Sequence, residues 1–185
     1  MRRPSPKFPS RIPSVLLLSL ALAASACATT RRPPLETVPH VDLERFMGEW
    51  YVIADIPTST EREAYNAVET YGLARDGTIK TTVRFLDGGC DGKEKTYTPR
   101  GFVIDKETNA VWGMQFVWPI KADYRIVYLN DDYSQTIIGR TQRDYAWIMA
   151  RKPVIPMEDY TRLRALLARL GYDVKKLRHV PQRWD

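Results

Sequence analysis

Between Trp50 and Ala150 the sequence divides into eight short segments with the composition of β-strands, and this pattern constrains the fold more than any other feature. Turn-forming residues such as glycine, aspartate, asparagine and proline separate the segments. No helical pattern interrupts them, which argues against a parallel sheet because parallel strands need long crossover connections. The predicted strands are 50–55, 65–73, 78–86, 95–104, 110–118, 124–129, 135–141 and 145–150. They predict an all-β fold, an eight-stranded antiparallel up-and-down barrel, since closure leaves no exposed sheet edge.

An amphipathic helix is predicted after the last strand. Pro156 suits the first helical position, and Gly171 suits the C-terminal cap. Between them, apolar residues recur at helical spacing, at Met157, Tyr160, Leu163, Leu166, Leu167 and Leu170. We expect this C-terminal α-helix to pack outside the barrel, on its wall. Docking of a partner helix on the apolar stripe is the alternative.

Three residues at the two ends of the barrel sequence are expected to hold the barrel closed. Gly48 and Trp50 begin the first strand, and Arg151 follows the last one. These strands must meet when the barrel closes, so the guanidinium can lie over the indole, a contact worth about 2 kcal/mol when water is excluded. Its donors can also satisfy carbonyls of a short helical turn, 41–46, which we expect to plug one end. This role is structural.

The interior of the predicted barrel is expected to hold an apolar ligand. Alternate residues of a strand point into the lumen, and eight strands enclose room for one small molecule or for packed side chains. The predicted ligand-binding residues of this calyx are Trp112, Met114, Phe116, Trp118, Tyr124, Tyr128 and Trp147. Aromatic rings and flexible methionines suit a guest with an apolar body and one polar end. The alternative is that these residues only fill the lumen or face the helix.

The N-terminus has the pattern of an export signal followed by a lipid anchor. Residues 1–26, the predicted signal peptide, contain a basic start and an apolar run too short to span a bilayer. Cys27 follows three small residues, an arrangement that resembles the lipobox of bacterial lipoproteins and implies acylation of this cysteine. Ordinary cleavage after Ala26, with an unmodified cysteine, is the alternative. Residues 27–40 are predicted to be a flexible tether, and residues 41–185 the barrel domain with its helix.

Neither the charge nor the reactive residues indicate nucleic-acid binding or catalysis. Four of the 28 basic residues precede Cys27, and the remaining 24 nearly balance the 22 acidic residues. His40 and His179 lie outside the predicted strands, and no spacing typical of a metal site occurs. Cys90 lies in a glycine-rich turn and has no intrachain partner if Cys27 is acylated. No catalytic residue, metal or cofactor is therefore predicted.

Glu69 and Asp55 are acidic residues that could reach the lumen from the predicted strands, although we favour surface or corner positions for both. A lumen carboxylate would suit the enzymatic alternative, a barrel isomerase that acts on a hydrophobic small molecule. Such enzymes can share a fold with binding proteins, so the fold alone does not decide between them.

Three motifs carry a resemblance to a known family. Gly48-Glu49-Trp50-Tyr51 has the form G-x-W, Ala122-Asp123-Tyr124 is similar to T-D-Y with alanine in place of threonine, and segment 145–151 ends in an arginine. Segment 66–71 also resembles the second strand of one subfamily. In these motifs, their order and their separation, the chain resembles the bacterial lipocalins over about residues 41–180.

The resemblance implies a calyx that binds fatty acids or lysophospholipids, for lipid storage or transport in envelope maintenance. It further implies a protein anchored in the outer membrane through the acyl group at Cys27 and facing the periplasm. Ala28, next to this cysteine, is consistent with such sorting. Homodimers occur among relatives. A structural envelope lipoprotein with a filled barrel is the alternative, and it predicts no cavity large enough for an acyl chain.

Overall fold

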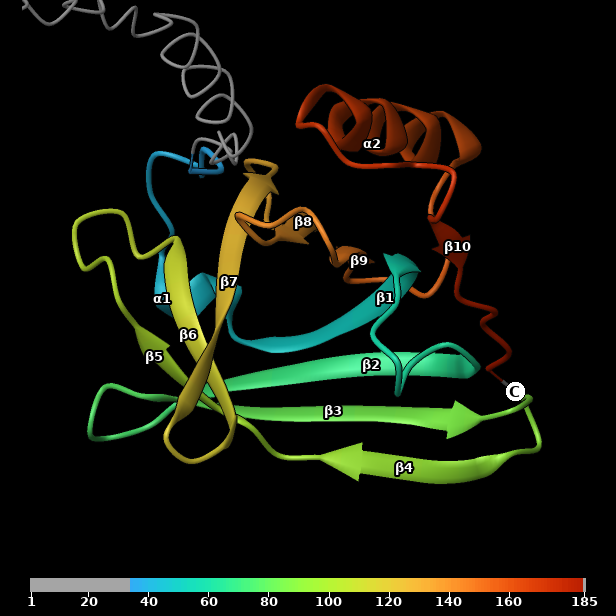
Figure 1. Cartoon of the computed structure of the whole chain (residues 1–185), viewed down its shortest axis with the longest axis horizontal. Coiled ribbons are helices and arrows are strands. Elements are labelled where there is room, and N and C mark those ends of the chain that lie inside the picture. Colours follow the sequence, from blue (N-terminus) through green and yellow to red (C-terminus); the bar gives the residue numbers. More distant parts are fainter. Residues whose placement is uncertain (1–33, 185) are drawn as a thin grey trace, which may run out of the picture. The chain divides into compact units, whose positions relative to one another are not determined.

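Ten strands of one antiparallel sheet close into a barrel in the computed structural model, which describes residues 34–184 (Figure 1). The strands are β1 (Gly48–Ile56), β2 (Ala64–Leu73), β3 (Ile79–Asp87), β4 (Lys93–Tyr97), β5 (Arg100–Val103), β6 (Val111–Val117), β7 (Ile120–Leu129), β8 (Gln135–Gly139), β9 (Ala146–Ala150) and β10 (Arg178–His179). Pairing of β9 with β1 closes the barrel. The predicted eight-stranded antiparallel barrel is confirmed, with β4 and β5 sharing one position in the wall. The short β10 pairs with the second half of β1.

The structure divides the predicted strand 95–104 into two strands. Both β4 and β5 pair with β3, and Thr98 and Pro99 separate them. Proline has no N–H to donate to a ladder, so continuous pairing stops there. In addition, β7 begins four residues earlier than predicted, at Ile120, and forms a tight hairpin with β6. Both differences affect the part of the wall that surrounds the cavity described below.

Aromatic side chains fill the barrel end at which β1 begins. The helix α1 (Leu43–Phe46) lies at this end, and Asp42 is its N-cap. Phe46 and Trp50 are fully buried, their ring centroids are 4.9 Å apart, and Trp50 Nε1 donates to Phe46 O at 2.8 Å. Tyr71 and Trp112 pack against the Phe46 ring. This end of the barrel is therefore closed by packed side chains.

Arg151 connects the end of β9 to the beginning of β1 and to α1. Its guanidinium carbon lies 3.9 Å from the centroid of the Trp50 ring. Its nitrogens donate at 2.7–3.2 Å to the carbonyls of Arg45, Phe46, Met47, Glu49 and Tyr133. Gly48 has a φ of +95°, and a Cβ at this position would stand 3.3 Å from Arg151 Nη1. Both the backbone conformation and the close approach favour glycine there.

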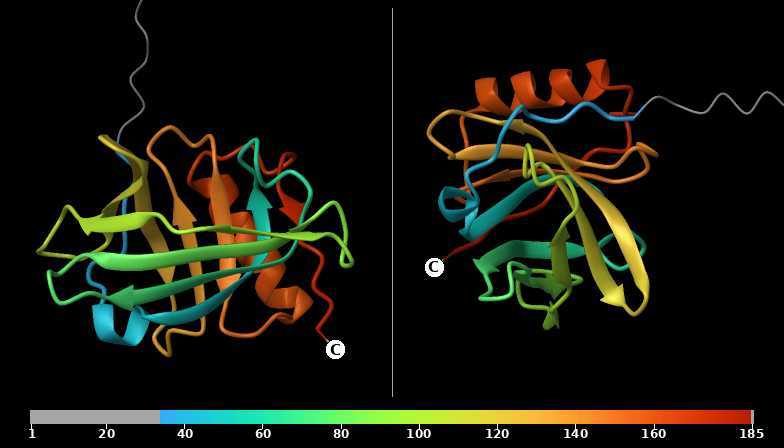
Figure 2. Two further views of the ribbon diagram at one scale, coloured as in Figure 1. Left: turned by 90° about the horizontal axis from the view of Figure 1, so that it is seen from below. Right: turned by 90° about the vertical axis from the view of Figure 1, so that its left-hand side faces the viewer.

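The C-terminal helix α2 (Met157–Arg169) lies on the outer face of the barrel, as predicted (Figure 2). Leu163 and Leu167 of the helix are fully buried. They pack in a cluster with Ile137 of β8 and Ile148 of β9, whose side chains point away from the lumen. The apolar stripe of the helix is thus covered by the protein's own barrel.

The part of the predicted tether that the structure describes packs against the barrel. Leu35 is 2% exposed and belongs to the same apolar cluster as α2. The Val38 N–H donates to Ile126 O at 3.0 Å. The chain from Pro34 onwards therefore belongs to the folded domain. The predicted signal peptide and Cys27 lie outside the described residues.

Candidate ligand-binding cavity

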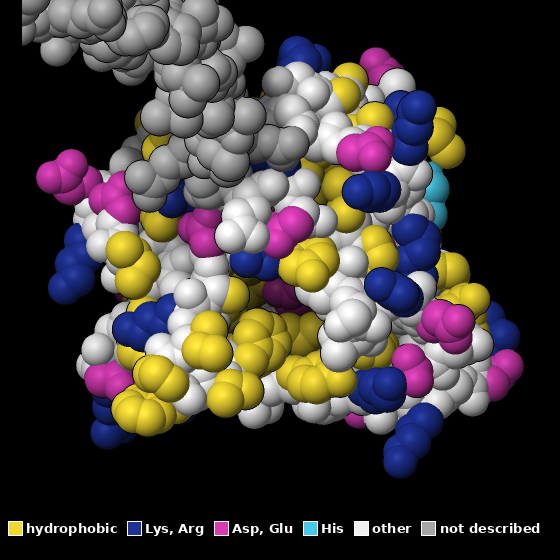
Figure 3. Space-filling model, in the orientation of Figure 1, with side chains coloured by type: hydrophobic (Ala, Val, Ile, Leu, Met, Phe, Trp, Pro, Cys, Tyr) yellow, Lys and Arg dark blue, Asp and Glu magenta, His cyan; other side chains and the backbone are white. Residues whose placement is uncertain are grey.

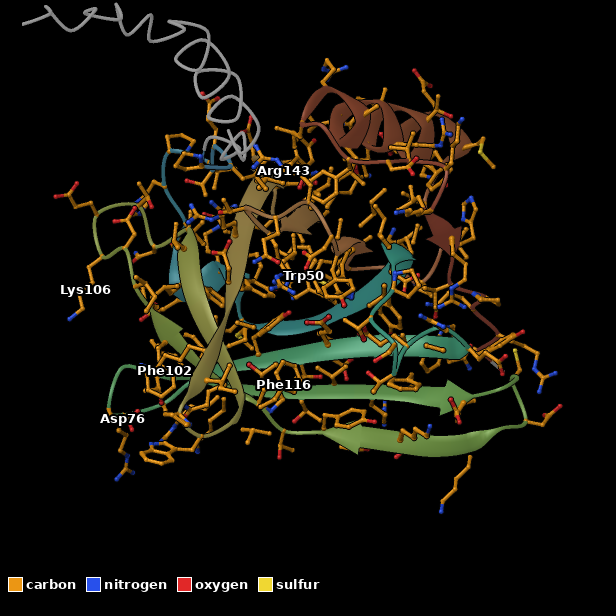
Figure 4. All side chains as sticks on the ribbon, in the orientation of Figure 1. Trp50, Asp76, Phe102, Lys106, Phe116 and Arg143 are labelled. Carbon is orange, nitrogen blue, oxygen red and sulfur yellow. The ribbon has the colours of Figure 1, made fainter. Side chains whose placement is uncertain are left out.

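A cavity of about 400 Å³ lies inside the barrel, within the range of roughly 300–1,000 Å³ that is usual for small-molecule sites. Thr58, Thr60 and Glu61 of the loop after β1 line it, so it lies at the opposite end of β1 from α1. Its apolar wall comes mainly from β3, β6 and β9, at Val83, Phe85, Met114, Phe116, Val117 and Trp147. Figure 3 shows hydrophobic side chains gathered around a hollow on one face of the molecule. In Figure 4, the side chain of Phe116 lies beside β6 and β7, and the side chain of Trp50 lies within the barrel.

The structure places four of the seven predicted calyx residues on the cavity wall, namely Met114, Phe116, Tyr124 and Trp147. Trp112 packs instead in the aromatic plug, where its ring stacks on Tyr124 at a centroid distance of 5.3 Å and its Nε1 donates to Asn109 O at 2.7 Å. Trp118 lies at the tip of the β6–β7 hairpin and is 82% exposed. Its strand ends at Val117, so the alternation that predicted a lumen position does not continue to it.

Tyr128 points out of the barrel, contrary to the prediction. The pairing of β7 with β8 shifts its register between Ile126 and Tyr128. A shift of one residue moves the following side chains to the opposite face of a strand. Tyr128 therefore contacts α2, where Arg162 Nη1 donates to its hydroxyl at 2.8 Å. The lumen-facing series that begins at Tyr124 ends at Ile126.

β3 contributes two wall residues, Val83 and Phe85, that were not predicted. In this strand, buried residues alternate regularly with more exposed ones from Ile79 to Phe85. A strict two-residue period is the signal that would have identified this inward face. Tyr97 of β4 extends the same wall, and its ring stacks on Phe85 with centroids 6.1 Å apart.

A buried polar network crosses the inner end of the cavity. Glu69 of β2 and Tyr124 of β7 line the cavity, and Tyr71 lies between them. The Tyr71 hydroxyl donates to Glu69 Oε2 and lies 2.6 Å from the Tyr124 hydroxyl. Glu69 is 6% exposed, and burial raises the pKa of its carboxyl group to about 7 although the Tyr71 hydrogen bond opposes the rise. The favoured surface or corner position for Glu69 is therefore wrong.

Asp55 is buried where β1 meets β10 and does not line the cavity. Arg178 Nε and Nη2 each donate to one of its carboxylate oxygens at 3.3 Å. Burial raises the pKa of Asp55 to about 6, and the positive charge of Arg178 opposes this rise. The ion pair fastens the C-terminal segment to the barrel, which is a structural role.

The charged groups on the cavity wall are Glu61, Glu69, Asp123 and Arg140. Arg140 Nη1 forms an ion pair with Asp144 at 3.3 Å. Asp123, the central residue of the second motif, is paired with Arg125 at 3.0 Å and accepts a hydrogen bond from Thr141 N at 2.8 Å. This backbone contact stabilises the corner although alanine replaces the usual threonine one residue earlier. The Asp123 carboxylate is thus held on the opposite face of β7 from Tyr124, which leaves Glu61 and Glu69 as the acidic side chains that face the cavity together with Arg140.

The histidines and the free cysteine of the described chain do not line the cavity. His40 is exposed, His179 packs on the Tyr160 ring of α2 at 4.0 Å, and Cys90 is a half-buried free thiol. Within residues 34–184, no group of three or more histidine, cysteine or acidic side chains is arranged to hold a metal ion. In the same range, no helix has the length and apolar character needed to span a membrane.

Comparison with known proteins places the motifs in a family. Residues 41–182 match the lipocalin-like domain. Temperature-induced lipocalin-1 of Arabidopsis thaliana is 30% identical over 162 residues, which cover 83% of this chain and 86% of that protein. Outer membrane lipoprotein Blc of Citrobacter freundii is 29% identical over 172 residues, which cover 92% of this chain and 97% of that protein.

The fold is also shared with solved structures. Insecticyanin of the tobacco hornworm Manduca sexta superposes with a TM-score of 0.64 at 16% identity, over 83% of this chain and 86% of that chain. The family match covers all ten strands and both helices of the barrel domain. This chain belongs to the lipocalin-like family.

Proposed function

We propose that this protein is a membrane-anchored lipocalin that binds a lipid-like ligand, a fatty acid or a lysophospholipid, for storage or transport in the bacterial envelope. The observation that carries the proposal is the cavity of about 400 Å³ with its apolar wall. Burial of each methylene group of an acyl chain in such a site contributes about 0.8 kcal/mol to binding. The lipocalin family binds small hydrophobic molecules, and the Blc relatives are named outer membrane lipoproteins, which supports this setting.

The distribution of side chains argues against a barrel that is packed solid. Aromatic rings fill the end covered by α1, where Phe46 and Trp112 are almost completely buried. At the opposite end, open space remains between Phe85, Met114 and Trp147. A structural lipoprotein with a filled barrel would not need this hollow, whereas a carrier requires it.

The tip of the β6–β7 hairpin supports a carrier that works at a lipid surface. Phe116, Val117, Trp118 and Ile120 are between 58% and 82% exposed. Phe116 and Val117 also line the cavity, so the apolar tip is continuous with its wall. Exposed aromatic and aliphatic side chains of this kind favour the boundary between water and lipid.

The proposed anchor at Cys27 leaves enough chain for the tip to reach the same lipid surface. Leu35 lies over Gly139, which pairs with Arg125. Five residues of β7 separate Arg125 from Ile120, a distance of about 17 Å along a strand. The eight residues from Cys27 to Leu35 span up to about 28 Å when extended. The anchor and the tip could therefore contact one membrane together.

Titration of delipidated protein with a fatty acid and with a lysophospholipid, followed by tryptophan fluorescence, tests the proposal. Val83→Trp fills the cavity from its wall and is expected to weaken binding at least about tenfold. Arg84→Trp adds the same side chain at the next, exposed position of β3 and serves as the matched control. No saturable response from wild-type protein, or equal effects of the two substitutions, would contradict the proposed function.

A further inference from the structure

The carboxyl group of Glu69 presents one oxygen to the cavity without a protein partner. Glu69 lines the cavity, and its side chain is more than nine-tenths buried. Its Oε2 accepts the Tyr71 hydrogen bond, whereas no group among residues 34–184 donates to Oε1. This oxygen can accept a hydrogen bond from a molecule in the cavity, so a ligand that supplies a donor there gains affinity.

The two tyrosines of the network keep Glu69 in the role of acceptor. The single hydroxyl proton of Tyr71 goes to Glu69 Oε2, so the 2.6 Å contact between the hydroxyls requires Tyr124 to donate to Tyr71. Burial raises the pKa of both tyrosines well above the ordinary value, because it disfavours the phenolate. Both hydroxyls therefore keep their protons, and both hydrogen bonds are directed toward Glu69.

The charges on the cavity wall disfavour an anionic group close to Glu69. Glu61 is the charged side chain of the wall that acts on Glu69 and raises its pKa further. Arg140 is paired with Asp144 through Nη1, and although its buried Nε has no hydrogen-bond partner, its charge does not contribute to the pKa shift of Glu69. Glu61 adds negative charge at the mouth, where its Oε1 lies 3.3 Å from Trp147 Nε1. Two carboxylates brought together in a site of low dielectric constant repel each other strongly.

We propose that Glu69 selects ligands by the polar group that the ligand buries in the cavity. A lipid-like molecule whose inner end is an ammonium or hydroxyl group then binds more tightly than a carboxylate of the same chain length. This inference rests on the proposed function, because it requires an acyl or alkyl chain in the calyx. Within the proposed class of lipid-like ligands, it favours those with a hydrogen-bond donor at the inner end. A fatty acid, in contrast, is expected to enter this calyx with its methyl end innermost.

The pH provides a test of this selection that needs no substitution. The titratable groups that face Glu69 are Tyr71 on β2, Tyr124 on β7 and Glu61 on the β1–β2 loop. Because burial raises the pKa of Glu69 to about 7, this carboxyl is ionised at pH 8.5 and protonated at pH 5.5. A long-chain amine keeps its positive charge at both pH values. Its advantage over the alcohol should therefore decrease as the pH is lowered.

The experiment compares three ligands with the same 12-carbon chain, namely dodecylamine, 1-dodecanol and dodecanoate. Isothermal titration calorimetry measures their affinities for delipidated protein at both pH values. Glu69→Gln retains an oxygen for the Tyr71 hydroxyl but presents an N–H donor to the cavity in place of the acceptor. Thr81→Val is the matched control, since it removes a buried inward hydroxyl of β3 that does not line the cavity.

We expect wild-type protein to bind dodecylamine at least about tenfold more tightly than dodecanoate at pH 8.5. Glu69→Gln should lose this preference, and Thr81→Val should keep it. Equal affinities in wild-type protein, or a preference that survives both Glu69→Gln and the change to pH 5.5, would overturn the inference and leave the proposed function intact. If none of the three ligands binds wild-type protein, both fail. The pH comparison keeps the inference testable even if Glu69→Gln does not fold.

Discussion

Arg151→Ala is expected to remove the contact that ties the ends of the barrel together. The guanidinium lies 3.9 Å from the Trp50 ring, and its three nitrogens donate to five backbone carbonyls. Three of these carbonyls share Nη2, so we count one effective hydrogen bond for each nitrogen, at about 1 kcal/mol. The cation–π contact of a partly buried guanidinium adds about 1 kcal/mol. The free energy of unfolding should therefore decrease by about 4 kcal/mol.

Urea denaturation followed by tryptophan fluorescence measures this loss. In a thermal scan it corresponds to a decrease in Tm of about 8–16 °C for a domain of this size. Arg151→Lys keeps the charge but loses the planar fork that reaches several carbonyls, so an intermediate loss is expected. Lys152→Ala removes a neighbouring exposed charge and should change stability by less than about 0.5 kcal/mol. If Arg151→Ala and Lys152→Ala behave alike, closure does not depend on this contact and the reasoning is refuted.

Two further predictions concern the cavity and the hairpin tip. Burial raises the pKa of Glu69 from 4.5 to about 7, so the stability that the protonated carboxyl contributes is complete below pH 4.5 and is lost as the pH rises through 7. In urea denaturation, the free energy of unfolding of Glu69→Gln should exceed that of wild type by up to about 3 kcal/mol at pH 8 and by little at pH 4.5. A difference in unfolding free energy that does not depend on pH would contradict this. Trp118→Ser should reduce cosedimentation with vesicles of phosphatidylethanolamine and phosphatidylglycerol severalfold, whereas Val154→Ser, at another exposed apolar residue, should not. Equal effects would exclude a special role of the tip.

The contacts at the closed end of the barrel could be predicted from sequence because they depend on barrel closure alone and not on the register of each strand. Any closed barrel brings its first and last strands together, whatever the lengths of the turns between them. Trp50 and Arg151 lie at the meeting ends of those strands, so their contact follows from closure. The helix α2 was predictable for a similar reason, since its apolar stripe is encoded within one continuous segment.

The cavity was less predictable because the direction of a side chain depends on register along the whole strand. One register shift in β7 turns Tyr128 outward, and no residue near it in the sequence indicates such a shift. Glu69 was missed because both faces of β2 are covered near it. Val68 next to it is also buried, so burial there follows no two-residue period. Part of that outer cover comes from the C-terminal segment, where Trp184 packs edge-on against Tyr51, the β1 partner of Val68.

The break between β4 and β5 and the end of the β5–β6 pairing leave one stretch of the barrel wall without strand pairing. β4 pairs with β3 alone, and β6 pairs with β5 only as far as Gln115. Residues 116–117 of β6 therefore have no described strand paired with them on the side where β4 lies. Residues 98–99, which connect β4 to β5, line the cavity. An unpaired strand edge invites association with other chains, and the charged residues 93–95 protect β4 against it. The exposed hairpin tip adjoins this unpaired stretch, and Phe116 and Val117 belong both to the tip and to the cavity wall.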